Sequence, residues 1–358
     1  MAKKICILAL ITILFSLGSP WIDPALASLP NGNRLKDPYA ILRNSLPIDQ
    51  KELRELQNKL EETSDDLRGS RWSAVSKATS RSQFLVSNKK NQILDSIPEE
   101  NKEKAVNLLS NLKEELDELG QIANEKNKVS FLNLRRQSLK TIDDIESLLI
   151  TNKFPYEIPS KYDNLPRLLG RANVEIKTSR GNMSAIIDGY NAPLTAGAFI
   201  DLSMKGFYDG LPINRAEEFF ILQTGDPKGE EIGYLNPDSN ELRKVPLEIR
   251  TRSFEDTLYG ETFEDVGLYT ETPILPFATL GTLGWAHSDS DLNDGSSQFF
   301  FFWYEAELNP AGRNLIDGRN AAFGYVIEGS EILNKLGVDD KIISIKVLNG
   351  SENLNLKA

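Results

Sequence analysis

The sequence is poor in the side chains that most often bind metals or carry redox and acid–base chemistry, because its 358 residues include one cysteine and one histidine. Zinc clusters, iron–sulfur centres, CxxC redox motifs and disulfide scaffolds are therefore excluded. A Ser-His-Asp triad has only His287 available. The formal net charge of -11 also removes any bulk attraction to nucleic acid or anionic lipid. The 40% of hydrophobic and 26% of charged residues are otherwise those of an ordinary globular protein.

Long apolar runs are scarce as well, and the one that occurs lies at the amino terminus. Two lysines precede the mostly apolar residues 5–17, and an Ala-Leu-Ala cleavage motif ends at Ala27. A run of this length is too short to span a bilayer comfortably, so we expect residues 1–27 to be a signal peptide removed on export. An uncleaved membrane anchor is the alternative. Cleavage removes Cys6 and leaves residues 28–36 as an amino-terminal linker.

Glycine and charge divide the rest of the chain into two parts. Glycine occurs only twice between residues 37 and 153, whereas twenty of the 24 glycines follow residue 160. Acidic and basic residues balance over residues 28–160, but the net charge of residues 161–358 is -12. A glycine-poor part followed by a glycine-rich and aromatic-rich part predicts a helical domain followed by a domain of strands and turns.

Apolar residues recur at helical spacing through the first part. Four such stripes lie within residues 47–69, 72–97, 98–123 and 131–149. Amphipathic segments with short connections predict an antiparallel helical bundle, which we place at residues 37–153. Three prolines in the next segment predict a linker over residues 154–171.

The second part opens with strand periodicity. Apolar residues alternate on both sides of Ser179-Arg180-Gly181-Asn182, which is the pattern of a β-hairpin. Residues 192–204 then predict a helix with Pro193 in its first turn. Short apolar segments separated by glycines follow, so residues 172–358 are predicted to form a β-barrel or sandwich with one or two helices.

Five motifs in this second part resemble the cyclophilins. They are Pro193 to Phe199 in the first helix; Arg215 followed by Phe220, Gln223 and Gly225-Asp226; Tyr259-Gly260-Glu261; Ser297-Gln298-Phe299-Phe300; and Asp317-Gly318-Arg319 with Phe323-Gly324. All five occur in the family's order. With the helical segment and the export signal ahead of them, the whole chain is similar to the multidomain cyclophilins of the thylakoid lumen. The resemblance implies a closed eight-stranded β-barrel capped by helices, with a substrate groove on its outer face.

The resemblance also implies a reaction, the cis–trans isomerisation of Xaa-Pro peptide bonds, for which no metal or other cofactor is required. Arg215 is the implied donor to the prolyl nitrogen, and Phe220 and Gln223 complete the implied catalytic set. The substrate-binding positions that the resemblance implies are Ile221, Ala286, His287, Gln298, Phe300, Leu315 and Asn320. We interpret His287 as a residue that lines the groove, because this reaction needs no general base.

The groove departs from the family pattern at several of these positions. Leu315 and Asn320 stand where many cyclophilins have tryptophan and histidine, and Ile221 replaces the usual methionine. Glu217 and its neighbour Glu218 lie beside Arg215, where a carboxylate can form an ion pair and occupy the guanidinium. We therefore expect weak isomerase activity and poor cyclosporin binding.

Two functions from different classes fit these observations. The first is an exported isomerase that assists folding or assembly of lumenal or membrane proteins, with photosystem II subunits as expected clients. The second is a non-catalytic scaffold that holds proline-containing segments, with the helical bundle regulating access to the groove. Both place the chain in the thylakoid lumen or periplasm of a cyanobacterium-like cell, without nucleic-acid partners and at most peripheral at the membrane. The acidic segment 289–295 superficially resembles a calcium loop, but we interpret it as a polar surface loop.

Overall fold

The computed structural model describes residues 36–150, 154–230, 232–237, 239–254, 256–303 and 314–356. The predicted signal peptide at 1–27, with Cys6, and the linker up to residue 35 lie outside these residues. Across the described ranges, no helix combines the length and the apolar character needed to cross a membrane.

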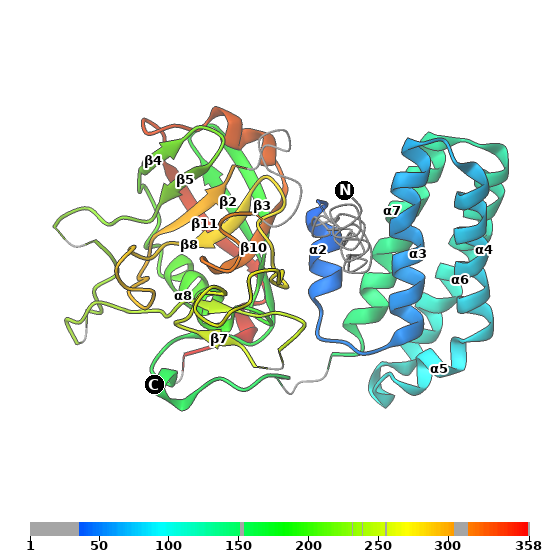
Figure 1. Ribbon diagram of the computed structural model, residues 1–358, viewed down its shortest axis with the longest axis horizontal. Coiled ribbons are helices and arrows are strands. Elements are labelled where there is room, and N and C mark those ends of the chain that lie inside the picture. The colour runs from blue at the N-terminus through cyan, green and yellow to red at the C-terminus, as the bar shows by residue number, and fades with distance from the viewer. Residues whose placement is uncertain are drawn as a thin grey trace, which may run out of the picture.

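Five helices form the first domain (Figure 1): α3 at Lys51–Arg68, α4 at Trp72–Asn88, α5 at Lys90–Asp95, α6 at Lys102–Glu125 and α7 at Lys128–Ser147. Side chains mark where two of them begin, since Gln50 accepts a hydrogen bond from Leu53 N and Asn127 accepts one from Ser130 N. The predicted apolar stripes meet in one core, where Leu56, Leu112 and Phe131 are fully buried. A helical bundle is therefore confirmed, with α5 as a short extra helix after α4.

The helix α2, Pro38–Ser45, packs on the other domain instead of the bundle core. Ile41 and Leu42 are each 2% exposed and belong to the same buried cluster as the barrel residues. Figure 1 shows α2 between the bundle and the barrel. Its sequence position next to the bundle thus does not determine the core to which it contributes.

The second domain is built on an eight-stranded antiparallel sheet. In spatial order its strands are β11 (Ile342–Asn349), β2 (Arg171–Thr178), β3 (Gly181–Asp188), β10 (Ala322–Glu328), β8 (Thr282–Trp285), β9 (Phe299–Phe302), β5 (Ile221–Thr224) and β4 (Ile213–Glu217). The edges meet where Pro212 bridges Lys341 and Ile213 N donates to Asp340 O at 2.9 Å. The predicted eight-stranded cyclophilin-type barrel with helices is confirmed, and its edge strands join through this short contact.

Smaller elements complete the barrel domain. The helix α8 spans Pro193–Met204. One two-stranded sheet pairs β1 (Arg167–Leu168) with β12 (Leu354–Asn355), and another pairs β6 (Glu248–Ile249) with β7 (Leu258–Tyr259). The 3₁₀ turns of this domain lie at Ser160–Tyr162, Ser330–Lys335 and Ser351–Asn353. A further 3₁₀ turn, Glu99–Asn101, precedes α6 in the bundle.

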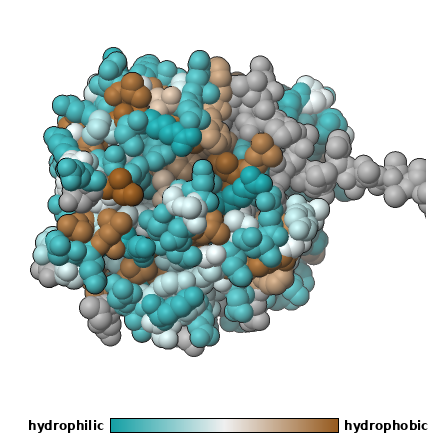
Figure 2. Space-filling model, turned by 60° about the vertical axis from the view of Figure 1, so that its left-hand side comes forward, coloured by the Kyte–Doolittle hydropathy of each residue, from teal (hydrophilic) through white to brown (hydrophobic). Residues whose placement is uncertain are grey.

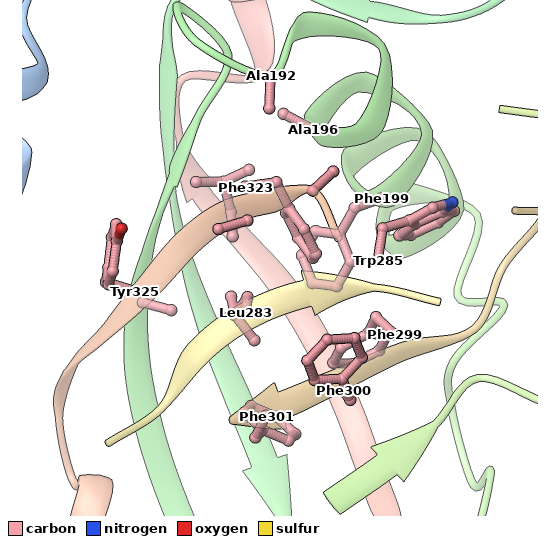
Figure 3. Close-up of a cluster of buried hydrophobic side chains, with 14 of the residues drawn as sticks. Ala192, Ala196, Phe199, Leu283, Trp285, Phe299, Phe300, Phe301, Phe323 and Tyr325 are labelled. Carbon is pink, nitrogen blue, oxygen red and sulfur yellow. The ribbon is translucent and has the colours of Figure 1, made fainter. Parts of the chain in front are cut away.

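Aromatic rings fill the interior of the barrel (Figure 3). Phe199 of α8 lies with its ring centroid 5.1 Å from that of Phe299 and 5.1 Å from that of Phe323. Side chains alternate along β9, so Phe300 instead contacts Phe277, with centroids 5.7 Å apart. The four phenylalanines of β9 therefore pack on both faces of the sheet, some in the core of the barrel and some beneath its outer surface.

A polar cluster joins α2 to the barrel. Arg171 donates from Nη2 to Ser45 Oγ at 2.9 Å, to Asp188 Oδ2 at 2.8 Å and to Leu42 O. Asn191 Nδ2 donates to Ser45 O at 3.0 Å. Because the Asp188 side chain is fully buried, this cluster compensates a charge that water does not reach.

The bundle holds α2 from its other side. Arg54 of α3 donates to Arg43 O at 2.7 Å and to Leu46 O at 2.8 Å, while Arg43 pairs with Glu61 at 3.1 Å. The carboxylate of Glu146 on α7 lies 3.4 Å from Arg54. Side chains from both domains thus converge on α2, which makes this helix the connection between them.

Two buried glutamates predict how stability changes with pH. Burial raises the pKa of Glu146 to about 8, although Arg54 opposes the rise, and burial raises the pKa of Glu248 to about 7. The ordinary value is 4.5, so the folded protein keeps these groups protonated at pH values where the unfolded chain has released the proton. Their contribution to stability is complete below about pH 4.5 and is lost as pH rises to about 8.

We therefore expect the melting temperature to fall between pH 5 and pH 8. The pKa of Asp143, which faces Glu146, is also raised by burial and acts in the same direction. The double variant Glu146→Gln with Glu248→Gln should lose most of this slope, because an amide does not titrate. Scanning calorimetry across this pH range measures it, and a wild-type stability that is flat or rises would contradict the assignment.

Candidate functional site

The register of three adjacent strands aligns the predicted catalytic positions. Arg215 on β4 is the direct partner of Gln223 on β5, and Gln223 is the partner of Phe300 on β9. Gly225, at a φ of +93°, lets the end of β5 approach β9 closely, since a Cβ there would lie 2.5 Å from Ser297 O. Arg215, Gln223 and Phe300 therefore form one row across the sheet.

The guanidinium of Arg215 is half exposed and already paired. Its Nε donates to Glu217 Oε1 at 2.7 Å, and Nη2 lies against the same oxygen. The two residues stand on the same face of β4, two positions apart, so the strand itself brings them together. The predicted ion pair between Arg215 and a neighbouring carboxylate is confirmed for Glu217.

The side-chain amides of Gln223 and Gln298 differ in how many of their atoms are hydrogen-bonded within the protein. Gln223 Nε2 donates to Gln298 Oε1 at 2.7 Å, while Gln298 Nε2 donates to Asp226 Oδ1 at 3.0 Å and to Ile232 O at 2.9 Å. Both ends of the Gln298 amide are thus engaged with the protein. Gln223 Oε1 has no hydrogen-bond partner among the described residues, so it is available to a bound molecule.

The apolar part of the groove is open mainly at Phe220. This side chain, in the turn between β4 and β5, is 36% exposed, whereas Ile221 and Phe300 are 4% and 5% exposed. The ring of Phe277 stacks on that of Phe300 at an interplanar angle of 14°. The ring of Phe220 packs edge-on toward that of Phe302, with centroids 6.5 Å apart, so Phe220 offers the exposed apolar surface of the groove.

The remaining predicted positions lie on the segments after β8 and before β10. Ala286 N donates to Gln298 O at 3.0 Å, which fixes this backbone beside β9. The ring nitrogens of His287 lie 2.8 Å from Ser288 O and 3.0 Å from Arg319 O, and Asn320 Nδ2 lies 3.4 Å from His287 Nε2. Ala286, His287 and Asn320 are thus grouped.

Leu315 differs from these grouped residues, because it projects into solvent with 75% of its surface exposed.

The acidic segment 289–295 closes on itself through hydrogen bonds from backbone N–H groups to its own carboxylates. Asp294 accepts from Ser288 N at 2.8 Å and Asp291 accepts from Asn293 N at 2.9 Å. In the described parts of the chain, no cluster of three or more acidic, His or Cys side chains is placed to hold a metal ion.

The sequence did not indicate two features near the groove. A small cavity behind Asn320 is lined by buried polar groups that include Asn191 and Glu248. At the end of the β4–β5 hairpin, Phe219 has a φ of +61° and its ring lies 5.9 Å from that of Trp303. A run of Glu-Glu-Phe-Phe in a tight turn was the only available signal for the second feature.

The bundle lies away from this groove. In Figure 1, β4 and β5 are on the side of the barrel opposite to α3, α4, α6 and α7. The hydrogen bonds and ion pairs described above between the domains run through α2, Arg171 and Asn191, none of which is a predicted groove residue.

Two family models match the chain. Residues 37–150 match "Peptidyl-prolyl cis-trans isomerase CYP38-like, PsbQ-like domain", and residues 173–347 match "Cyclophilin type peptidyl-prolyl cis-trans isomerase/CLD". A cyclophilin-type domain therefore follows a helical domain that has its own family model.

Two similar proteins align with nearly the whole chain. A protein of Synechocystis sp. named as a thylakoid lumen peptidyl-prolyl cis-trans isomerase is 43% identical, over 92% of this chain and 86% of its own. The chloroplastic peptidyl-prolyl cis-trans isomerase CYP38 of Arabidopsis thaliana is 36% identical, over 93% of this chain and 78% of its own. The chain belongs to the cyclophilin-type peptidyl-prolyl cis-trans isomerases, in the CYP38-like group.

A solved structure was also matched. A cyclophilin type peptidyl-prolyl cis-trans isomerase of Cryptosporidium parvum, studied in the presence of the dipeptide Ala-Pro, is 21% identical. The match covers 49% of this chain and 99% of that chain, with a TM-score of 0.35.

Proposed function

We propose that the groove binds an extended client segment and isomerises its Xaa-Pro bond slowly. The observation that carries this proposal is the direct pairing of Arg215 and Gln223 on adjacent strands, beside the exposed ring of Phe220. This arrangement offers a cationic donor and an amide acceptor in one row of residues, with an exposed apolar ring in the adjoining turn.

Each of these groups has a role in the proposed reaction. The uncatalysed barrier of about 18–20 kcal/mol comes from amide resonance, which is lost as the bond twists. Arg215 donates to the prolyl nitrogen and stabilises the twisted form more than either planar form, which lowers the barrier. Gln223 Oε1 accepts from a client backbone N–H, and Phe220 packs against the proline ring. Gln298 positions Gln223, and Ala286, His287 and Asn320 line the other wall.

The same geometry supports a low rate. Glu217 holds Nε and Nη2 of Arg215, so its carboxylate competes with the prolyl nitrogen for these donors. Leu315 is exposed and has no indole N–H to donate, and Ile221 is almost covered. We propose poor cyclosporin binding for the same reasons.

Glu217→Gln should raise kcat/KM for a neutral proline peptide about twofold to fivefold. The amide holds the guanidinium less tightly, and a surface ion pair of this kind is worth about 0.2–1 kcal/mol. Exchange NMR on the peptide measures the rate without a coupling protease.

The matched control is Glu264→Gln, because Glu264 forms an ion pair with Arg319 at 2.6 Å and is similarly exposed, at 44% against 47% for Glu217. An equal rise in both variants, or none in Glu217→Gln, would show that the Glu217 pair does not restrain the reaction.

We further propose that the chain acts after export, in a thylakoid lumen or periplasm, on lumenal or membrane proteins under assembly. The names of the relatives support this setting, since one is called a thylakoid lumen protein and the other chloroplastic. Photosystem II subunits are the clients we propose. Locating the tagged protein by cell fractionation and identifying proteins crosslinked to it would test the setting and the clients.

The second candidate function is a scaffold that holds proline segments without turning them over. The ion pair at Arg215 favours it, because a guanidinium held by Glu217 can still contribute to binding in the groove without catalysing isomerisation. The placement of β4 and β5 away from the bundle argues against direct covering of the groove by the bundle, so under either function we assign the bundle to recruitment or positioning.

A further inference from the structure

The turn between β4 and β5 contains a backbone conformation that its side chain does not favour. Phe219 has a φ of +61°, in the left-handed region that large side chains rarely adopt. Glycine or asparagine occupies such positions without this cost. Conformations of this kind cluster where a side chain is needed for function.

The left-handed turn directs an aromatic ring to the surface. The Phe219 ring lies 5.9 Å from the Trp303 ring at an angle of 45°, and Trp303 N donates to Phe220 O at 2.8 Å. Phe219 is 45% exposed, so the ring adds little to the core. Figure 2 brings this side of the molecule forward and shows hydrophobic groups as separate patches on a mainly hydrophilic surface.

The charge beside these rings is uncompensated. Glu217 is paired with Arg215, but the exposed Glu218 has no hydrogen bond or ion pair among the described residues. We name Glu218, Phe219 and Trp303 the aromatic rim. A Lys or Arg side chain is attracted both to the face of an aromatic ring and to a free carboxylate. The acidic excess of residues 161–358 also favours a positively charged side chain in the bound segment.

The rim lies close enough to the groove for one client segment to reach both. Arg215 and Glu217 are two strand positions apart, about 7 Å at the usual rise, and Glu218 and Phe219 of the rim follow directly, with Trp303 beside Phe219. An extended peptide covers this distance in two to four residues. We propose that the aromatic rim is a subsite for a basic residue two to four positions from the client proline, a substrate class that rests on the proposed function of the groove.

The experiment compares proline peptides that differ only in charge. Arginine or citrulline, which has nearly the same shape without the charge, is placed two, three or four positions before or after the proline. Titration calorimetry with the full chain measures each Kd. We expect at least one position at which arginine binds about fivefold to tenfold more tightly than citrulline, as an exposed cation–π contact and ion pair together allow. High salt should reduce that ratio.

Variants then assign the preference to the rim. Phe219→Gly should bring the ratio of arginine to citrulline affinity close to one while the melting temperature stays equal or rises, because glycine suits this φ. Glu218→Gln should reduce the ratio partly. Tyr269→Ala, at a 68% exposed aromatic outside the rim, should leave it unchanged.

Equal affinities of arginine and citrulline at every position, or a preference that survives in Phe219→Gly, would overturn the proposed subsite while leaving proline binding intact. Failure of every peptide to bind, citrulline forms included, would overturn the groove function together with the subsite.

Discussion

Arg215→Ala is expected to lower kcat/KM for a neutral proline peptide about tenfold to a hundredfold. A hydrogen bond from a charged donor is worth about 1.5–3 kcal/mol, and each 1.4 kcal/mol corresponds to tenfold in rate. Among the described residues the half-exposed guanidinium pairs only with the similarly exposed Glu217, so its removal should not affect folding. Exchange NMR gives the rate, and circular dichroism verifies the fold.

This variant also separates the two candidate functions. An isomerase loses turnover in Arg215→Ala but keeps much of its peptide affinity, because Phe220 and Gln223 remain. A scaffold shows no turnover in either protein, and its support of client assembly is unchanged. Arg215→Lys is the conservative control, and it should recover part of the rate, since lysine keeps the charge but not the planar set of donors. A change below about threefold in Arg215→Ala would remove Arg215 from the reaction.

The groove residues could be named from the sequence because their motifs resemble those of the cyclophilins, and the local hairpin then accounts for one of their pairings. Arg215 and Gln223 flank a tight turn, and the antiparallel register of a hairpin places such residues opposite each other. The bundle could be predicted for a different reason, since apolar spacing alone defines which face of each helix is buried. That information lies within a few turns of each helix.

Features that depend on distant partners were not predictable. The apolar residues of α2 fit either core, and contacts with Arg171 and Asn191, more than a hundred residues away, decide for the barrel. The engaged amide of Gln298 depends on Ile232 O, in a loop whose course the sequence does not specify. The left-handed Phe219 likewise packs near Trp303, which follows five further strands in the sequence.

The second large effect is expected at the connection between the domains. Arg171→Ala should destabilise the barrel domain by about 3–5 kcal/mol, the usual loss when one partner of a buried ion pair is removed. The Asp188 side chain is fully buried, and without Arg171 its donors in the described part of the chain are Ser45 and the backbone and side chain of Asn191. Because α2 loses its bonds to Arg171 at Ser45 and Leu42, it should also detach more often.

Hydrogen exchange resolves both parts of this prediction, because it reports each segment separately and does not require the two domains to unfold together. In Arg171→Ala, protection should fall in β2, β3 and α2, while α4 and α6 of the bundle keep theirs. Arg180→Ala is the matched control, since Arg180 lies in the β2–β3 turn, pairs with Asp340 and is 51% exposed; the buried Asp340 keeps donors from Ser179 and Gly337, so the loss should be smaller than in Arg171→Ala. Equal effects of the two variants would mean that α2 is not anchored through Arg171.

A fragment that begins at residue 172 lacks both Arg171 and α2, so its stability should resemble that of Arg171→Ala or be lower. Any activity measured on this fragment would therefore understate that of the full chain.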